Sequence, residues 1–296
     1  MDMQSVSIIG VGRVGGALAL ALSRKGYYLE NLVCRGTEIA TNIARELPNR
    51  PKLINSSELT DLNSEILFIT TADTEIGSVA DQLTVCLTGR PFVFHTSGSL
   101  SSDILYKLKQ IGCKTGSIHP LVSVTDPFRG AERFAGAHFC IEGDKEATDL
   151  AGKIVADIGG MSFTIETELK PLYHASAVTA SGHFVALIDV ALEMLSKCGL
   201  APDEGSKILL PLIRSTVENL ETQTTEQALT GTFARADIDA FKRHLALLER
   251  NVSVEAKDIY LALAERSLDL AKQKGADLQH IEMIRKEISI AKRKTE

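Results

Sequence analysis

The sequence predicts an α/β domain with a mainly parallel, doubly wound sheet, followed by an all-α domain. Short apolar, β-branched runs alternate with helical patterns in the first half of the 296-residue chain, as in parallel sheets that helices cover on both faces. After about residue 166 no convincing strand appears, and apolar residues recur three and four positions apart. We therefore place the two domains at residues 1–165 and 166–296.

The predicted elements follow one another in a regular order. In the first domain, strands are expected within residues 6–10, 28–34, 65–71, 91–97, 114–120, 137–143 and 161–166, and helices within residues 15–26 and 143–159. In the second domain, helices are expected within residues 176–199, 203–222, 232–250, 253–275 and 281–296. The last of these is charged and is expected to lie in solvent.

The composition favours a small molecule as the partner. The chain has 32 basic and 38 acidic residues, and its formal net charge of −6 gives no general attraction to nucleic acid or to an anionic membrane. No uninterrupted apolar run approaches the roughly 20 residues that span a bilayer, and the first residues lack a signal-peptide pattern, so we expect a cytoplasmic protein. Five scattered cysteines without metal-ligand spacing predict free thiols and no metal site. They are Cys34, Cys86, Cys113, Cys140 and Cys198.

A glycine-rich turn near the N-terminus indicates a dinucleotide site, with a purely structural turn as the alternative. Gly10, Gly12 and Gly15 form the pattern GxGxxG directly after a β-branched strand and directly before an apolar helix. Gly10 suits the tight turn, Gly12 lets a pyrophosphate approach the backbone, and Gly15 lets helix and strand pack closely. The amides of this turn, which includes Arg13 and Val14, and the positive end of the helix dipole can then hold the phosphates.

The end of the second strand favours NADP over NAD. Proteins that select NAD usually place an acidic side chain about twenty residues after the glycines, whereas Arg35 and Thr37 follow the strand here. Arg35 can pair with a 2′-phosphate and Thr37 can add a hydroxyl donor, although Arg35 could also be an ordinary surface residue. Thr71 and Ala72 come at the end of the strand expected within residues 65–71 and are expected to border the cofactor. Asp73 is expected to cap the next helix.

Two later strands end in polar side chains that suit a substrate site, because ligands of open parallel sheets bind beyond the carboxyl ends of the strands. Ser97 ends the first of these strands and His119 lies at the end of the second. The hydroxyl and the imidazole could bind substrate oxygens or stabilise developing charge. Ser97 is not expected to be a nucleophile, since the sequence has no GxSxG elbow. His119 precedes Pro120 and could instead only order that turn.

These motifs together resemble the 6-phosphogluconate dehydrogenase-like oxidoreductases, which have an N-terminal Rossmann domain and a helical C-terminal domain. Within this group the chain is similar to a family of Rossmann-like proteins whose C-terminal part is a domain of unknown function. The similarity lies in GVGRVGGALA, HTSGSL, GSIHPL, KPLYHASAV and ALTGTFARADIDAFKRHLALL. The resemblance implies an NADP-dependent oxidoreductase and a homodimer formed through the helical domains.

The stretch ELKPLYHASAVTASGH contains the candidate proton donors. The resemblance implies a catalytic Lys with an Asn four residues later, as in the β-hydroxyacid dehydrogenases; here Lys170 matches the Lys, and His174 stands in place of the Asn. On one helix over residues 168–187, Lys170, His174 and Ser181 fall on a single face. His183 points away from that face and is expected to be a packed or hydrogen-bonded histidine.

A later stretch, ALTGTFARAD, resembles a family pattern of TGP followed by a basic residue and GD. Thr232 and Ala236 replace the expected Pro and Gly. Arg235, Asp237 and His244 are therefore second-rank candidates. Helix capping by Asp237 and surface positions for the other two are the alternatives.

The leading hypothesis is an NADP-dependent reductase or dehydrogenase that moves a hydride between the nicotinamide and a small carbonyl, alcohol or imine carbon at the domain junction. Lys170 or His174 would donate the proton, while Ser97 and His119 would hold substrate oxygens. A second hypothesis is a non-catalytic NADP-binding sensor or scaffold that dimerises through its helical domain. A third replaces the nicotinamide by a deazaflavin or another hydride carrier.

Overall fold

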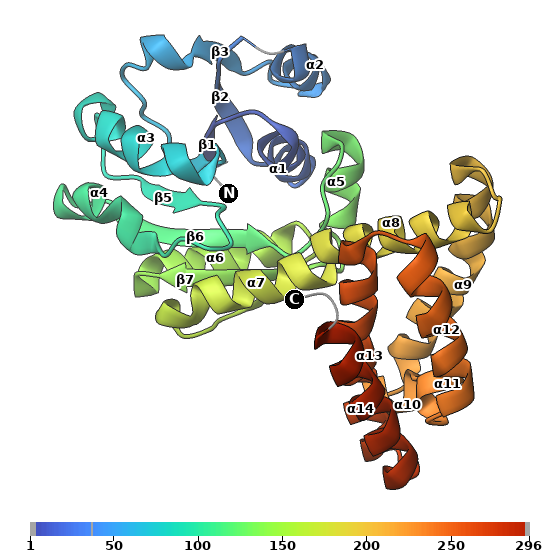
Figure 1. Ribbon diagram of the computed structural model, residues 1–296. Helices are drawn as coiled ribbons and strands as arrows, with labels where there is room; N and C mark the ends of the chain where they lie inside the picture. The colour runs from blue at the N-terminus through green and yellow to red at the C-terminus, as the bar shows by residue number, and fades with distance from the viewer. Residues whose placement is uncertain (1–3, 37, 294–296) are drawn as a thin grey trace. The chain divides into compact units, whose positions relative to one another are not determined.

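The computed structural model describes residues 4–36 and 38–293, and the chain divides into two compact units (Figure 1). The first unit extends to Gly182 and the second begins at His183. This division lies later in the chain than the predicted boundary at residue 166. The helix that directly follows the last strand therefore belongs with the sheet.

The first unit is built on one eight-stranded sheet in the order β3-β2-β1-β4-β5-β6-β7-β8. Neighbouring strands are parallel except for β6 and β7, which are antiparallel. The mainly parallel sheet that the sequence predicts is confirmed. The strands are β1 Ser5–Ile9, β2 Tyr28–Cys34, β3 Lys52–Asn55, β4 Ile66–Ile69, β5 Phe92–His95, β6 Lys114–Pro120, β7 His138–Gly143 and β8 Met161–Phe163.

Helices cover both faces of this sheet because side chains alternate between its faces along each strand. Ile8 and Phe68 belong to one core cluster with the apolar side chains of α1, whereas Ile9 and Leu67 belong to a second cluster with those of α3. The helices of this unit are α1 Arg13–Arg24, α2 Glu38–Glu46, α3 Asp73–Cys86, α4 Tyr106–Gln110, α5 Pro127–Arg133, α6 Lys145–Asp157 and α7 Lys170–Ala180. Short 3₁₀ turns are η1 Ser56–Glu58, η2 Ser102–Leu105 and η3 Thr167–Leu169.

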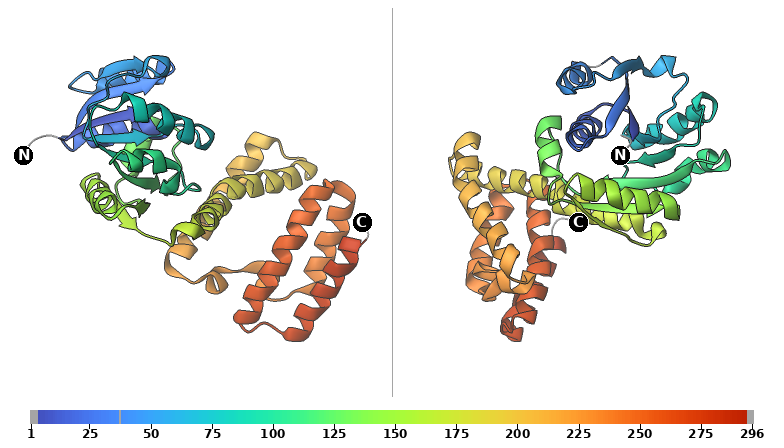
Figure 2. Two further views of the ribbon diagram at one scale, coloured as in Figure 1. Left: turned by 90° about the vertical axis from the view of Figure 1, so that its left-hand side faces the viewer. Right: turned by 180° about the vertical axis from the view of Figure 1, so that it is seen from behind.

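The second unit contains only helices among the residues that the structure describes, as the sequence predicts (Figure 2). Its core consists of Phe241 and Leu245 from α12, Leu261 and Leu268 from α13, and apolar residues of α14 such as Ile284. Its helices are α8 Gly182–Lys197, α9 Pro202–Thr222, α10 Thr225–Ala228, α11 Gly231–Ala234, α12 Ile238–Asn251, α13 Val254–Gln273 and α14 Leu278–Arg293.

The predicted continuous helix over residues 168–187 is interrupted. Helix α7 ends at Ala180, Ser181 has the non-helical angles φ −120° and ψ −72°, and α8 begins at Gly182. Taken together with the preceding turn, the stretch Thr167–Lys197 is long and apolar enough to cross a membrane by length and composition, a test that core helices of soluble proteins also pass. The sequence expectation concerned an uninterrupted apolar run, whereas this stretch passes the test on its mean hydropathy, because Ala, Val and Leu outweigh the interspersed Ser, Thr and His.

Candidate functional site

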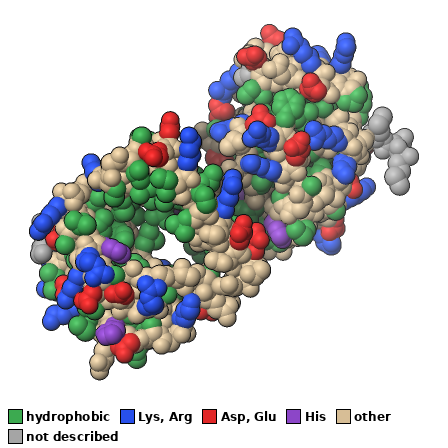
Figure 3. All heavy atoms as spheres, turned by 90° about the vertical axis from the view of Figure 1, so that its right-hand side faces the viewer, with side chains coloured by type: hydrophobic (Ala, Val, Ile, Leu, Met, Phe, Trp, Pro, Cys, Tyr) green, Lys and Arg blue, Asp and Glu red, His purple; other side chains and the backbone are tan. Residues whose placement is uncertain are grey.

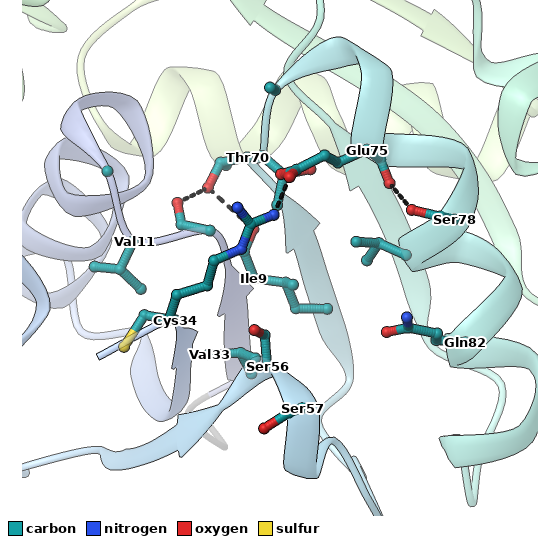
Figure 4. Close-up of a pocket in the computed structure, with 16 residues that line it drawn as sticks. Ile9, Val11, Val33, Cys34, Ser56, Ser57, Thr70, Glu75, Ser78 and Gln82 are labelled. Atoms are coloured by element: carbon teal, nitrogen blue, oxygen red, sulfur yellow. Dashed lines mark hydrogen bonds and ion pairs between the residues drawn. The ribbon is translucent and has the colours of Figure 1, made fainter. Parts of the chain in front are cut away.

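A cavity of about 510 Å³ opens at the carboxyl ends of β1, β2 and β4 (Figure 4). The backbone around it depends on the glycines that the sequence singles out. Gly10 has φ +99°, and a Cβ there would lie under 3.0 Å from the backbone of Thr71. A Cβ on Gly15 would overlap the carbonyl oxygen of Gly10. A Cβ on Gly12 would meet no atom within 4 Å, so this glycine leaves open space beside the first turn of α1.

Polar side chains line this cavity from the ends of β2 and β4 and from α3. Thr71 and Ala72 line it after β4, and the hydroxyl oxygen of Thr71 is buried without a hydrogen-bond partner. Arg35 lines the cavity from the end of β2 and forms an ion pair with Glu75 of α3. A buried polar atom without a partner costs free energy unless a ligand or water satisfies it, so Thr71 points to a ligand here.

Some expected cofactor residues contribute differently or lie outside the described residues. The side chain of Arg13 is exposed and that of Val14 packs against the core, and neither residue lines the cavity. Thr37 lies outside the residues that the structure describes. Ser56 and Ser57 line the cavity from the end of β3, and sequence reasoning missed them together with Glu75 and Gln82. For the two serines, the signal was hydroxyls directly after a short strand.

A second cavity, of about 470 Å³, lies beside the end of β6 and along α7. His119, His174 and Ser181 all line it. The rings of the two histidines meet edge to face, with centroids 5.7 Å apart. A Cβ on Gly98 would lie under 3.0 Å from both Nε2 of His119 and Nδ1 of His174. Only a glycine at this position allows the two imidazoles to converge.

The hydrogen bonds of the two histidines differ. Nδ1 of His119 lies 2.7 Å from the phenol oxygen of Tyr173, whereas Nδ1 of His174 is buried and has no partner. Burial, followed by the nearby His174 and Lys170, lowers the pKa of His119 to about 4. Burial also raises the pKa of Tyr173, which therefore keeps its proton at neutral pH. His119 is then a neutral imidazole at neutral pH.

Lys170 does not share the cavity with His174 and Ser181, contrary to the predicted stripe. Its side chain is 0% exposed, and its Nζ lies 3.1 Å from Oε1 of Glu142 and also donates to the hydroxyl of Ser117. Helix α7 lies against β6 and β7 at its first turn, which turns this position toward the sheet rather than toward the cavity. Burial lowers the pKa of Lys170, and the Glu142 carboxylate opposes that effect.

The carboxylate of Glu142 is fully hydrogen-bonded. Ser102 donates to it from its backbone amide and from its hydroxyl, each at 2.8 Å, and Ser117 donates at 2.9 Å. Burial alone would raise the pKa of Glu142, but the Lys170 ammonium and these hydrogen bonds outweigh burial and lower it. The pair is therefore an internal ion pair between α7 and β7.

Ser97 also has its hydrogen bonds within the protein. Its hydroxyl donates to Asp73 at 2.7 Å and accepts from the amides of Ser99 and Leu100 at 3.1 and 2.9 Å. This arrangement orders the loop after β5 and leaves the hydroxyl no free position toward a substrate. Asp73 is the first residue of α3, after the N-cap Ala72, and not the expected cap itself.

His95, His183 and the second-rank candidates lie outside the two cavities. His95 is fully buried, and burial followed by the nearby Lys170 lowers its pKa to about 3. His183 is exposed rather than packed. Asp237 caps α12 by accepting from the amide of Ala240, His244 pairs with Tyr260, and Arg235 is exposed. None of the last three lines the two cavities described above.

Comparisons with known proteins follow the same two parts of the chain. A Rossmann-like domain matches residues 2–120, and a domain of unknown function, DUF2520, matches residues 137–267. The expected likeness to Rossmann-like proteins whose C-terminal part is a domain of unknown function is thereby confirmed. No curated protein matches the sequence.

Solved structures share the fold over nearly the whole chain. A protein from Thermotoga maritima is 24% identical with a TM-score of 0.72, over 91% of this chain and 99% of that one. A "putative NADP oxidoreductase" from Bacteroides fragilis is 20% identical with a TM-score of 0.72, over 90% and 98%. The pyrroline carboxylate reductase of Plasmodium falciparum, solved with NADP bound, is 13% identical with a TM-score of 0.55, over 91% and 98%. At these identities the likeness shows the fold.

Proposed function

We propose that this protein is an NADP-dependent oxidoreductase that transfers a hydride between the nicotinamide and a small carbonyl, alcohol, imine or amine substrate. The observation that carries the proposal is the glycine-bounded cavity at the carboxyl ends of β1, β2 and β4, which is where open parallel sheets bind dinucleotides. The NADP oxidoreductase and reductase names of the structural neighbours agree with it.

The residues around the cavity fit a phosphorylated dinucleotide. Open space beside Gly12 suits a pyrophosphate at the N-terminus of α1, and the unpartnered hydroxyl of Thr71 can bond a polar group of the cofactor. Arg35 offers a guanidinium for a 2′-phosphate once it leaves Glu75. When bound, the cofactor supplies or accepts the hydride.

We propose that the group that donates the proton lines the second cavity. His174 lines this cavity, so its imidazole can exchange a proton with the substrate oxygen or nitrogen. His119 lines the same cavity and can bind the same substrate group. Lys170 is fully buried against Glu142, which favours His174 of the two proton donors that the sequence leaves open.

A binding experiment tests the cofactor site. Gly12→Val should fold normally, because a Cβ there meets no atom, yet its side chain should abolish NADPH binding by filling the pyrophosphate position. Arg35→Ala should weaken NADPH about 10- to 100-fold and leave NADH nearly unchanged, because it removes one charge-assisted contact to the 2′-phosphate. Fluorescence titration of the purified variants measures both.

Gly89→Val is the matched control, since the same change there introduces a Cβ with only an ordinary contact, to Asn63, outside both cavities. NADPH binding that Gly12→Val leaves intact would overturn the assignment of the cofactor site.

Binding without turnover across a panel of carbonyls and imines would favour the non-catalytic sensor. A titration in which only a deazaflavin binds would favour the third hypothesis.

Dimerisation and a cytoplasmic location are part of the proposal. No residue of α8 is buried, although its side chains are largely apolar. They line an apolar groove of about 400 Å³ with residues of α9 and α13, and Figure 3 shows hydrophobic side chains gathered on one face. An exposed apolar surface of this kind is typical of a protein–protein interface. We propose that a second copy of this chain covers it.

A further inference from the structure

Tyr173 and His119 form a close, well-packed pair. The phenol oxygen of Tyr173 lies 2.7 Å from Nδ1 of His119, and the two rings meet edge to face with centroids 5.6 Å apart. Phe163 of β8 also packs edge to face against Tyr173, at 5.8 Å between centroids. The phenol is therefore held by apolar contacts that do not involve its hydroxyl group.

We propose that Tyr173 is a positioning residue that holds His119, a residue lining the second cavity, in the tautomer that carries its hydrogen on Nε2. A neutral imidazole carries one hydrogen, so an Nδ1 that accepts a hydrogen bond leaves that hydrogen on Nε2. Tyr173 acts as the donor because Nδ1 of His119, 2.7 Å away, is the only hydrogen-bond partner of its phenol oxygen among the described residues, and the reverse direction would leave the phenol hydrogen without an acceptor. His119 stays neutral because burial and the positive charge of Lys170 disfavour its imidazolium form.

The geometry around Gly98 makes this tautomer useful. Nε2 of His119 points toward Gly98, on the side where Nδ1 of His174 also lies, and both atoms are close to the position of a Cβ on Gly98. The two ring nitrogens therefore lie beside the same glycine. With the tautomer fixed, His119 presents a permanent donor on that side.

The inference rests on the proposed function and narrows its substrate class. A carbonyl or hydroxyl oxygen accepts a hydrogen bond from an N–H donor. A protonated imine has no lone pair on its nitrogen and cannot accept one. The neutral Nε2–H of His119 therefore fits a carbonyl or hydroxyl oxygen, or a neutral imine nitrogen, and excludes the protonated imine.

The tautomer of His119 can be determined in the protein without cofactor or substrate. In ¹⁵N-labelled full-length protein, long-range correlations between the carbon-bound ring protons and the ring nitrogens distinguish a protonated nitrogen from an unprotonated one. The spectrum of His119→Asn identifies the His119 signals. We expect the Nε2–H form alone between about pH 6 and 8, because the pKa of His119 lies below this range. Tyr173→Phe should keep the ring packing but convert the His119 signals to those of a mixture of tautomers.

The chain offers a matched control in its helical unit, where the phenol oxygen of Tyr260 lies 2.8 Å from Nδ1 of His244. Tyr260→Phe should alter the His244 signals and leave those of His119 unchanged. A wild-type His119 that is the Nδ1–H form or an imidazolium would overturn the inference, and so would a single unchanged tautomer in Tyr173→Phe. A failure to bind NADPH in a separate titration would overturn the proposed function and leave the tautomer result standing.

Discussion

The buried histidines His95 and His119 make the stability of the fold depend on pH. Their pKa values in the folded protein are about 3 and about 4, below the usual value near 6.5 in the unfolded chain. Between those values the unfolded chain binds more protons, so stability is present near neutrality and is lost as the pH falls through 6.5. We expect each histidine to remove about 2 kcal/mol from the free energy of unfolding at pH 5.

Urea unfolding at pH 7.5 and pH 5 measures this loss. The groups near His119 that influence it are Lys170, Tyr173 and His174 on α7 and Asp73 on α3. His119→Gln removes one of the two titrating groups and should reduce the pH dependence by roughly half. The exposed His183 is the control, and His183→Gln should leave the dependence unchanged. A free energy of unfolding that is flat between the two pH values would contradict the prediction.

At the residue scale, the sequence identifies side chains by type and by their place at the ends of strands. That was enough to select His119, whereas its partner Tyr173 lies 54 positions away and becomes visible only when α7 packs on β6. Lys170 and Ser97 show the converse. Both stand where a catalytic group is expected, yet internal hydrogen bonds engage both, and no local pattern encodes those bonds.

At the scale of the element, helix α7 is attached to the sheet by the buried ion pair of Lys170 and Glu142. Lys170→Met leaves the Glu142 charge buried without its partner, which should lower the free energy of unfolding by about 3–5 kcal/mol. Combining Lys170→Met with Glu142→Leu removes both charges. The double variant should therefore lose less stability than Lys170→Met alone, although Ser102 and Ser117 lose their acceptor.

Thermal or urea unfolding of the three proteins checks this ordering. Lys145 provides the surface control, because its ion pair with Asp149 is exposed on both sides, and Lys145→Met should change stability by less than about 0.5 kcal/mol. A Lys170→Met variant as stable as the wild type would show that the pair does not hold α7 in place.

Elements with strong periodicity were predictable, and their ends were less so. Alternating strands and helices identified the parallel sheet, because buried parallel strands read as continuous apolar runs. The apolar pattern continues through Ser181 and gives no sign of the break there, since Ser, Gly and Ala fit a helix surface as well as a helix end. The contacts that assign α7 to the first unit are likewise tertiary, which is why the predicted boundary fell before this helix.

At the scale of the whole molecule, the apolar groove of α8, α9 and α13 is expected to be covered by a second copy of the chain. Leu212 lines this groove and is 63% exposed, so Leu212→Glu should introduce a charge that a dimer would have to bury. Burying an unpaired carboxylate costs several kcal/mol, which is enough to convert a micromolar dimer to a monomer at working concentrations.

Light scattering coupled to size-exclusion chromatography, in buffer without detergent, measures the mass of each protein. We expect twice the mass of one chain for the wild type and the mass of one chain for Leu212→Glu. Leu247 on α12 is 62% exposed and does not line the groove, so Leu247→Glu carries the same change at a matched exposure and should remain a dimer. A monomeric wild type would contradict the proposed dimer. Wild-type protein that requires detergent would instead indicate that the apolar stretch Thr167–Lys197 meets a membrane.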